Sequence, residues 1–470
     1  MSVKFRYLVA LCALYSLAFA APLTTEGRLA DLEDRLDDIE FQAGLDKIKF
    51  GLDFSTGVNE SWFKIGERYT SSGGTPTLNA EDKFKAHNKW AMELNLNMNA
   101  AINDYTKFYG RLSMAKNYGM LDTASVHSPV DTDAGRDLRT SGQSIYVSRA
   151  YVDLFLSPEI VATLGRQPST DGPGSNLRNN ALRQGTYPAL LFNALGDAAV
   201  LSYKPNFAKQ LQFAVRAAYG KFYQVDNEGV VRDWTSRQDM ADTDLWYASF
   251  EIQPYLGTLG KNTLFMVSYA RLHDLALDLS LLGNNPATNE PYGVRNLGTI
   301  DTVNVHFESY RAFGLPLNYF VSGSYMKGSK PTDLGATKLN SFVTAETDTQ
   351  KTFFNEESAF AIHAGLRYDF HRLFKFGAEY FYGSQYWFPF SRLSLNDPLN
   401  IRSTRGHAYD IYVISQLDRN QFFRLSYTHI QNKYNNRGVP IGGAYGADEK
   451  AKGGYESTAN SVMLIYNVKF

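Results

Sequence analysis

From Asp46 to Phe470, one short segment after another carries apolar side chains at every second position. The clearest pattern is in the last ten residues, 461–470, where one alternate set is apolar and the other becomes polar toward the end. A period of two indicates a β-strand with one face in an apolar medium and the other near water. About ten tilted residues are enough to cross the hydrocarbon core of a bilayer. Because unpaired strand edges cannot be left in lipid, the pattern predicts a closed barrel.

The same alternation predicts an all-β chain with about sixteen antiparallel transmembrane strands. In residues 90–98, large apolar side chains alternate with Asn95 and Asn97, which places amides inside the barrel and apolar groups outside. The other segments share this period. The predicted strands are 48–54, 90–98, 107–114, 148–156, 160–166, 198–204, 210–220, 244–253, 263–272, 302–308, 317–327, 358–369, 374–382, 408–416, 422–431 and 461–470.

The connections between these segments alternate strictly between short and long. Tight periplasmic turns and long external loops produce this alternation in outer-membrane barrels, whereas a soluble sandwich rarely does. An even strand number also brings both ends of the barrel to the side of the short turns. Examples of short connections are 101–105, 157–159, 205–209, 371–373 and 418–420, and the long ones are 58–82, 115–142, 167–197, 222–242, 273–298, 328–356, 383–406 and 432–456.

The N-terminus carries the pattern of a secretory signal over residues 1–20. Lys4 and Arg6 precede a short apolar run, and the small-x-small triplet 18–20 follows it as a cleavage site. The short run and the cleavage site argue against a membrane anchor. Cys12 is the only cysteine and lies within the signal, so the mature chain has no disulfide, thiolate nucleophile or cysteine metal site.

Residues 21–45 form a second segment, ahead of the barrel at 46–470. Leu29, Leu32, Leu36 and Ile39 recur at spacings of three and four, as in a coiled coil. Because a helix this short is marginal in water, the segment predicts self-association, and three copies can pair beneath a trimer. The alternative is a periplasmic helix that packs against no fixed partner.

The order of the strands and loops, with two local sequences, resembles the sixteen-stranded trimeric porins of bacterial outer membranes. The local sequences are R-A-Y-V-D-L from Arg149 and L-G-R-Q from Leu164, and the chain ends on Phe470. The resemblance implies a homotrimer in the outer membrane of a Gram-negative bacterium, surrounded by lipid and lipopolysaccharide. It also implies a water-filled channel for small hydrophilic solutes and ions, with no cofactor. The net charge of −1 gives no strong field for nucleic acid, so no such partner is expected.

In such porins the loop after the fifth strand folds inward and narrows the pore, and here that loop is 167–197. Residues 176–184 are expected to form a short helix, and the apolar run 186–192 is expected to anchor the loop to the inner wall. The resemblance implies an acidic loop and a basic wall, but this loop leans basic, which argues against simple cation selectivity. A wall charge can instead be a salt bridge that holds strands together. The candidate constriction residues are Arg178, Arg183 and Asp171 on the loop, and Arg149, Arg111, Asp153 and Arg216 on the wall.

Four functional classes fit this sequence. A passive diffusion porin comes first, followed by a channel selective for anions or sugars. A barrel-type hydrolase is weaker, because no metal-ligand or nucleophile motif is present and the eight histidines are scattered. His306 is its best lone candidate, so no catalytic or metal residue is assigned and no enzyme is expected. The fourth class is a sheath around a periplasmic electron carrier.

Overall fold

The computed structural model describes residues 48–72, 75–118, 145–184, 187–224, 241–278, 294–330, 353–354, 356–391 and 394–470. The predicted signal (1–20) and coiled-coil segment (21–45) lie outside these residues. Throughout the described ranges, no helix is both long and apolar enough to cross a membrane.

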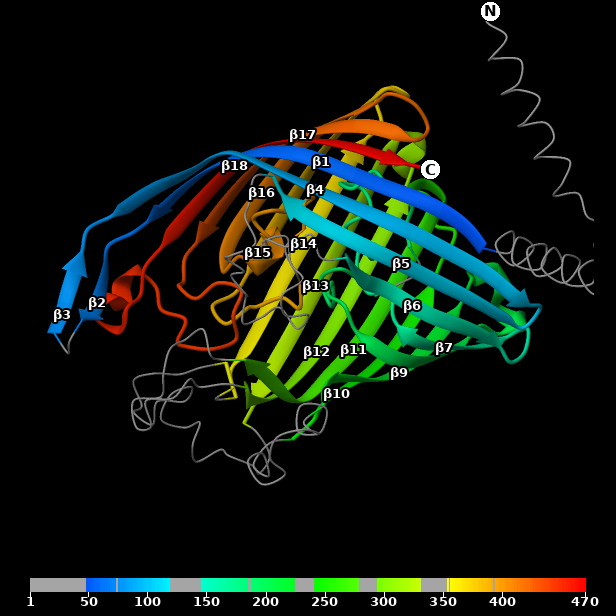
Figure 1. Cartoon of the computed structure of the whole chain (residues 1–470), viewed down its shortest axis with the longest axis horizontal. Coiled ribbons are helices and arrows are strands. Elements are labelled where there is room, and N and C mark those ends of the chain that lie inside the picture. The colour runs from blue at the N-terminus through cyan, green and yellow to red at the C-terminus, as the bar shows by residue number, and fades with distance from the viewer. Residues whose placement is uncertain are drawn as a thin grey trace, which may run out of the picture. The chain divides into compact units, whose positions relative to one another are not determined.

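Sixteen antiparallel strands form a closed barrel in which consecutive strands pair with one another (Figure 1). Closure comes from β1 and β18, which pair from Asp53 opposite Lys469 to Ile65 opposite Ser457. The predicted all-β, closed antiparallel barrel of about sixteen strands is therefore confirmed. The barrel strands are β1 (Ile48–Ile65), β4 (Asp82–Asn103), β5 (Thr106–Asn117), β6 (Ile145–Phe155), β7 (Ile160–Arg166), β8 (Asp197–Tyr203), β9 (Ala214–Tyr223), β10 (Thr243–Ile252), β11 (Lys261–Asp278), β12 (Val294–Tyr310), β13 (Leu317–Ser329), β14 (Ser358–Tyr368), β15 (Phe374–Gly383), β16 (Gly406–Gln416), β17 (Gln421–Asn432) and β18 (Ser457–Lys469).

Each of the sixteen predicted segments lies in a different barrel strand, but some boundaries differ. β1, β4, β11 and β12 extend well beyond the prediction, and the first long loop contains a hairpin of β2 (Arg68–Ser72) and β3 (Thr75–Asn79). The prediction that a strand begins at residue 210 was wrong. A 3-10 helix, η1 (Asn206–Leu211), occupies this position, and Gln212 follows it in a left-handed conformation with φ 46°. The chain therefore returns to the sheet only at Ala214.

Alternate residues face opposite sides of the wall, as the period of two predicts. On β18, Val462 and Leu464 remain 38% and 42% exposed on the outside, whereas Met463 and Ile465 are buried inside. On β4, Asn95 is buried on the inner face, where its carbonyl oxygen accepts a hydrogen bond from Ser113 of β5. The outer face is thus apolar and the inner face carries the polar groups.

The two ends of the barrel differ in their connections, as predicted. At the short-turn end, a few residues join β4 to β5, β6 to β7 and β16 to β17. The first strand and the C-terminal residue meet at this end, where Leu52 of β1 and Phe470 exchange backbone hydrogen bonds of 3.0 and 2.9 Å. The long-loop end carries the connections after β1, β5, β7 and each later odd barrel strand. Two of these loops, after β7 and after β15, contain the residues that matter for the interior.

Candidate functional site

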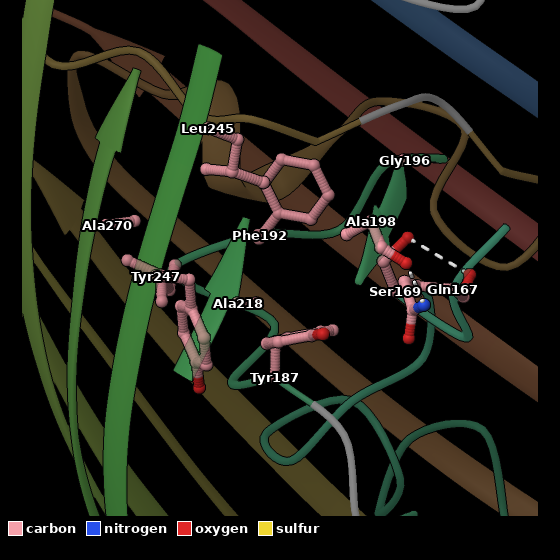
Figure 2. A pocket seen from close by; sticks show the side chains of 11 residues that line it. Gln167, Ser169, Tyr187, Phe192, Gly196, Ala198, Ala218, Leu245, Tyr247 and Ala270 are labelled. Atoms are coloured by element: carbon pink, nitrogen blue, oxygen red, sulfur yellow. Dashed lines mark hydrogen bonds between the residues drawn. The ribbon is translucent and has the colours of Figure 1, made fainter. Parts of the chain in front are cut away.

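Residues 167–196, called here the inward loop, connect β7 to β8. Gly165 ends the regular wall with φ 119°, and a Cβ at that position would lie 2.2 Å from the carbonyl oxygen of Ala150. The side-chain amide of Gln167 then donates a hydrogen bond to the carbonyl of Gly165 at 3.0 Å. It also donates to the carbonyl of Ala198 at 2.8 Å (Figure 2). These bonds fix the base of the loop to its own strands as the chain turns away from the sheet.

The end of the inward loop packs on the inner wall through an apolar anchor, Leu190, Leu191 and Phe192. All three are buried in a cluster that includes wall residues of β10 to β12 and aromatic residues of the loop after β15. Tyr187 stands edge-to-face to Tyr247 of β10, with ring centroids 4.7 Å apart (Figure 2). A cavity of about 30 Å³ remains between this anchor and the wall, which is room for water but not for a solute. The predicted anchoring by this part of the loop is confirmed.

The middle of the inward loop forms successive turns, so the helix expected over 176–184 was wrong. The physical reason is that its backbone carbonyls are bonded to guanidinium groups from elsewhere. Arg367 of β14 donates to the carbonyl of Leu177 at 2.8 Å, and Arg424 of β17 donates to the carbonyl of Arg178 at 3.0 Å. Arg402, from the loop after β15, reaches the carbonyl of Gly174 at 3.4 Å. Charge-assisted bonds of this kind are stronger than neutral ones.

Arg178 is the charged centre of this attachment and is only 4% exposed. Its guanidinium lies 3.3 Å from a carboxylate oxygen of Asp410 (β16), 3.3 Å from Asp397 and 3.9 Å from Glu379 (β15). Burial opposes the charged form, but these three carboxylates together raise the pKa of Arg178 above its ordinary value. Arg178 of the inward loop thus faces three carboxylates, whereas the resemblance implied an acidic loop and a basic wall.

Asp397 belongs to residues 384–405, called here the second loop, which connects β15 to β16. Burial tends to raise the pKa of Asp397, but Arg178 and Arg402 and the backbone N–H of Ile401 lower it below its ordinary value. Two loops and two strands therefore meet at one buried cluster of charges. Breaking such a cluster by removing one partner is costly, because it leaves buried charge uncompensated.

The other two candidate residues of the inward loop have different surroundings. Arg183 donates to the carbonyl of Asn262 at 2.8 Å and to Gln253 at 3.1 Å, near the short-turn end of β10 and β11. Asp171 accepts a hydrogen bond from Asn179 at 3.4 Å, within the loop itself. The two arginines therefore do not pair with Asp171, although the three residues belong to the same loop.

The four wall candidates lie on β5, β6 and β9. Arg111 donates to Asn97 at 2.6 Å, and Arg149 donates to Gln184 of the inward loop at 3.3 Å. Asp153 accepts from the hydroxyl of Thr163 at 2.6 Å. Each of these wall side chains is half-buried.

Arg216, the fourth wall candidate, makes a bidentate pair with Glu251 of the neighbouring β10, at 2.6 and 2.9 Å. The pair connects adjacent strands, as the structural alternative for a wall charge proposes.

The two halves of the inner wall differ sharply in burial. On β12 to β17 the inner-face residues Asn304, His306, Phe320, His363, Asp410 and Arg424 are all at most 1% exposed. On β4 to β6 the inner-face charged residues Glu93, Arg111, Arg149 and Asp153 stay half-buried, and Lys107 is exposed. Both loops fill the first half, and the second half keeps polar groups in contact with solvent.

Comparison with known proteins gives a family but no activity. Residues 83–469, from the start of β4 almost to the end of β18, match the family described as a protein of unknown function (DUF3373). The chain belongs to this family. No curated protein sequence matches it.

Among solved structures, the DUF3373 barrel is similar to outer-membrane proteins. OprB of Pseudomonas putida at high pH is 11% identical with a TM-score of 0.46, over 91% of this chain and 95% of OprB. A loop L8 deletion mutant of OmpT, an outer membrane protein of Vibrio cholerae, is 12% identical with a TM-score of 0.44, over 90% of this chain and 99% of that one. These similarities concern the fold alone.

The second loop of the DUF3373 barrel contains residues that sequence reasoning missed. Trp387 is fully buried, and its indole N–H donates to the carbonyl of Arg402 at 2.7 Å. Arg405 donates to the carbonyls of Trp387, Asn435 and Val439 at 2.8–3.0 Å, and burial lowers its pKa to about 9. The available signal was the run W-F-P-F at 387–390, which resembles the anchor of the inward loop in joining proline to large apolar residues.

Within the described part of the DUF3373 chain, no group of three or more His, Cys, Asp or Glu could hold a metal ion. His306 lies 3.4 Å from Glu308, and both side chains are completely buried. Asn176 of the inward loop covers this pair by donating to Glu308 at 2.7 Å.

Proposed function

We propose that this protein is an outer-membrane porin: a water-filled channel for the passive diffusion of small hydrophilic solutes and ions. The observation that carries the proposal is the uneven burial of the inner wall. The inward loop and the second loop are fixed to β12–β17, while the charged inner face of β4–β6 remains accessible. The passage then runs between the loops and that accessible wall, and the inward loop sets its width.

The barrel's physical character supports a location in the outer membrane. A closed sheet has no edge strands to leave unsatisfied in lipid, and its outer face is apolar. Lipid and lipopolysaccharide are then its surroundings. Residues 21–45 supply the proposed three-stranded coiled coil, so the working unit is a homotrimer.

Substitutions on β4 test the orientation of the wall. Leu96→Arg places a charge on the outer face near the middle of the strand, and we expect it to lower the free energy of unfolding in bilayers by about 2–4 kcal/mol. The matched variant Asn99→Arg places the same charge on the inner face of the same strand and is expected to cost far less. Urea unfolding in lipid vesicles measures both. Equal costs would contradict the assignment of the two faces.

The complete burial of the His306–Glu308 pair supports a channel rather than a hydrolase. A general base must come within hydrogen-bonding distance of its substrate, and His306 is sealed beneath Asn176 and Phe320. Purified protein with His306→Ala is therefore expected to conduct like the native channel. Lipid or peptide hydrolysis by the native protein that this substitution abolishes would overturn the proposal.

The deciding experiment is the single-channel conductance of purified protein in planar bilayers. A trimer is expected to insert with about three equal current levels, one for each barrel. Reversal potential in a salt gradient then reports the charge preference. If the inserted, folded barrel carries no ion current, the passage is closed and the proposed function fails.

The lowered pKa of Asp397 predicts how the conductance of the channel responds to acid. Its pKa in the folded protein lies below the ordinary 3.8, so its stabilising effect is complete above that pH and is lost as pH falls through the lower folded value. The contribution of Asp397 to the loop attachment, and with it the difference in conductance between the native channel and an Asp397→Asn variant, is expected to stay constant from pH 7 to about pH 4 and to be lost below that. The variant should show the loosened state already at neutral pH. Loss of this difference between about pH 5 and 7 would contradict the assignment.

A further inference from the structure

A second space lies inside the barrel beneath the base of the inward loop. It measures about 330 Å³ and is bounded by the inner faces of β6 to β10. Gln167, Pro168 and Tyr187 of the inward loop form its remaining side. It is about ten times larger than the gap behind the apolar anchor and falls at the lower end of the size range of small-molecule sites. We call it the vestibule cavity.

The acidic groups of the vestibule cavity are already engaged by neighbouring side chains. Asp153 accepts the hydroxyl of Thr163, and Glu251, just beyond the lining, is held by both terminal nitrogens of Arg216. Arg216 already compensates the charge of Glu251. Asp153 is the only carboxylate among the described residues that line the cavity.

The cationic side chains around the cavity are not all engaged in this way. Lys204 lines the cavity at the end of β8 and is exposed, and no carboxylate among the described residues pairs with it. Arg216 lies diagonally beside it, because Ser202 is the direct partner of Arg216 across β8 and β9. On the other flank, the ammonium of Lys107 lies 5.1 Å from the ring centroid of Phe155, which also lines the cavity. The charged residues that line the cavity, Asp153, Lys204 and Arg216, have a net charge of +1.

Flat aromatic groups accompany these charges. Tyr151 lines the cavity and stacks on Tyr109, with ring centroids 5.0 Å apart and an interplanar angle of 18°. Tyr187 and Tyr247, which also line the cavity, meet edge-to-face. The hydroxyl groups of Thr163 and Ser202 also line the cavity. Planar apolar surface next to unpaired positive charge suits a solute with the same two parts.

We infer that the vestibule cavity is a binding station for small planar organic anions, of which an aromatic carboxylate is the simplest. The carboxylate interacts with Lys204 and the neighbouring hydroxyls, and the ring lies among the tyrosines. This inference rests on the proposed channel and names its preferred solute. A station in the path gives selectivity only if binding is weak enough to allow release.

The test is block of the open channel by benzoate, added from the short-turn side. We expect the current to fall saturably with benzoate concentration, and less with cyclohexanecarboxylate, which has the same charge without the flat ring. Benzamide, which lacks the charge, and glucose should have little effect. Lys204→Gln should weaken the benzoate block about tenfold, the effect of losing one charge-assisted contact. The matched control Lys209→Gln removes a lysine of η1, outside the cavity lining, and should leave the block unchanged.

A second substitution separates charge from shape. Tyr151→Leu is expected to abolish the difference between the block by benzoate and the block by cyclohexanecarboxylate. A channel that conducts but shows no benzoate block overturns the binding station and leaves the porin proposal standing. Block by glucose instead of benzoate would assign the cavity to sugars and overturn it too. If no current flows at all, the failure lies with the proposed channel.

Discussion

Replacing Arg178 with methionine is expected to raise the single-channel conductance and to lower the stability of the folded barrel. Methionine keeps most of the length but removes the positive charge that faces Asp410, Asp397 and Glu379. Leaving buried carboxylates without their partner costs about 3–5 kcal/mol. The cheapest response is for the middle of the inward loop to leave the wall, which widens the passage. Planar-bilayer conductance and the unfolding temperature in detergent report the two effects.

Arg183→Met is the matched control on the same loop. Arg183 bonds a carbonyl and an amide rather than a carboxylate, so its removal is expected to cost less, about 1.5–3 kcal/mol, and to change the conductance little. Native conductance in the Arg178 variant would contradict the role of the charge cluster in holding the loop. A larger change from Arg183 than from Arg178 would place the narrowest point beside β10 and β11 instead.

The barrel was predictable from the sequence because its cause is local. Each strand has one face in an apolar medium, so a period of two is written into every segment, as in Asn95 and Asn97 of β4. Turn lengths then give the topology without any long-range information. Departures occur where local conformation overrides the pattern, as at Gln212, whose left-handed backbone follows η1 and delays the start of β9.

The interior was much less predictable, because contacts between residues far apart in the chain determine it. The period of two places Glu379 and Asp410 on the inner faces of their strands, but nothing in the sequence pairs them with Arg178, about 200 residues earlier. The prediction of a helix in the inward loop was wrong for the same reason. Its carbonyls are bonded to Arg367 and Arg424 of strands β14 and β17, and local propensity carries no record of those donors.

Replacing Trp387 with alanine is expected to release the second loop and, through it, the inward loop. The indole is fully buried, and removing such a side chain costs about 3–5 kcal/mol. Trp387 also donates to the carbonyl of Arg402, the arginine that contacts Gly174 of the inward loop. Loss of the indole therefore loosens the segment that supplies Asp397 to the charge cluster. We expect lower stability and a wider, noisier channel, measured as for Arg178→Met.

Two further variants separate packing from hydrogen bonding. Trp387→Phe keeps much of the buried ring but loses the N–H donor. The lost hydrogen bond should lower the free energy of unfolding by about 1 kcal/mol, in addition to the cost of the smaller ring. The conductance should stay near native. Trp246→Ala removes a tryptophan that is 53% exposed on the outer face of β10 and should not change the conductance. If Trp387→Ala destabilises the barrel but conducts normally, the second loop is structural and does not control the passage. In that case, the losses of unfolding free energy from Trp387→Ala and Arg178→Met should add in the double variant. If the two residues act together, the double variant should lose less than the sum of the single variants.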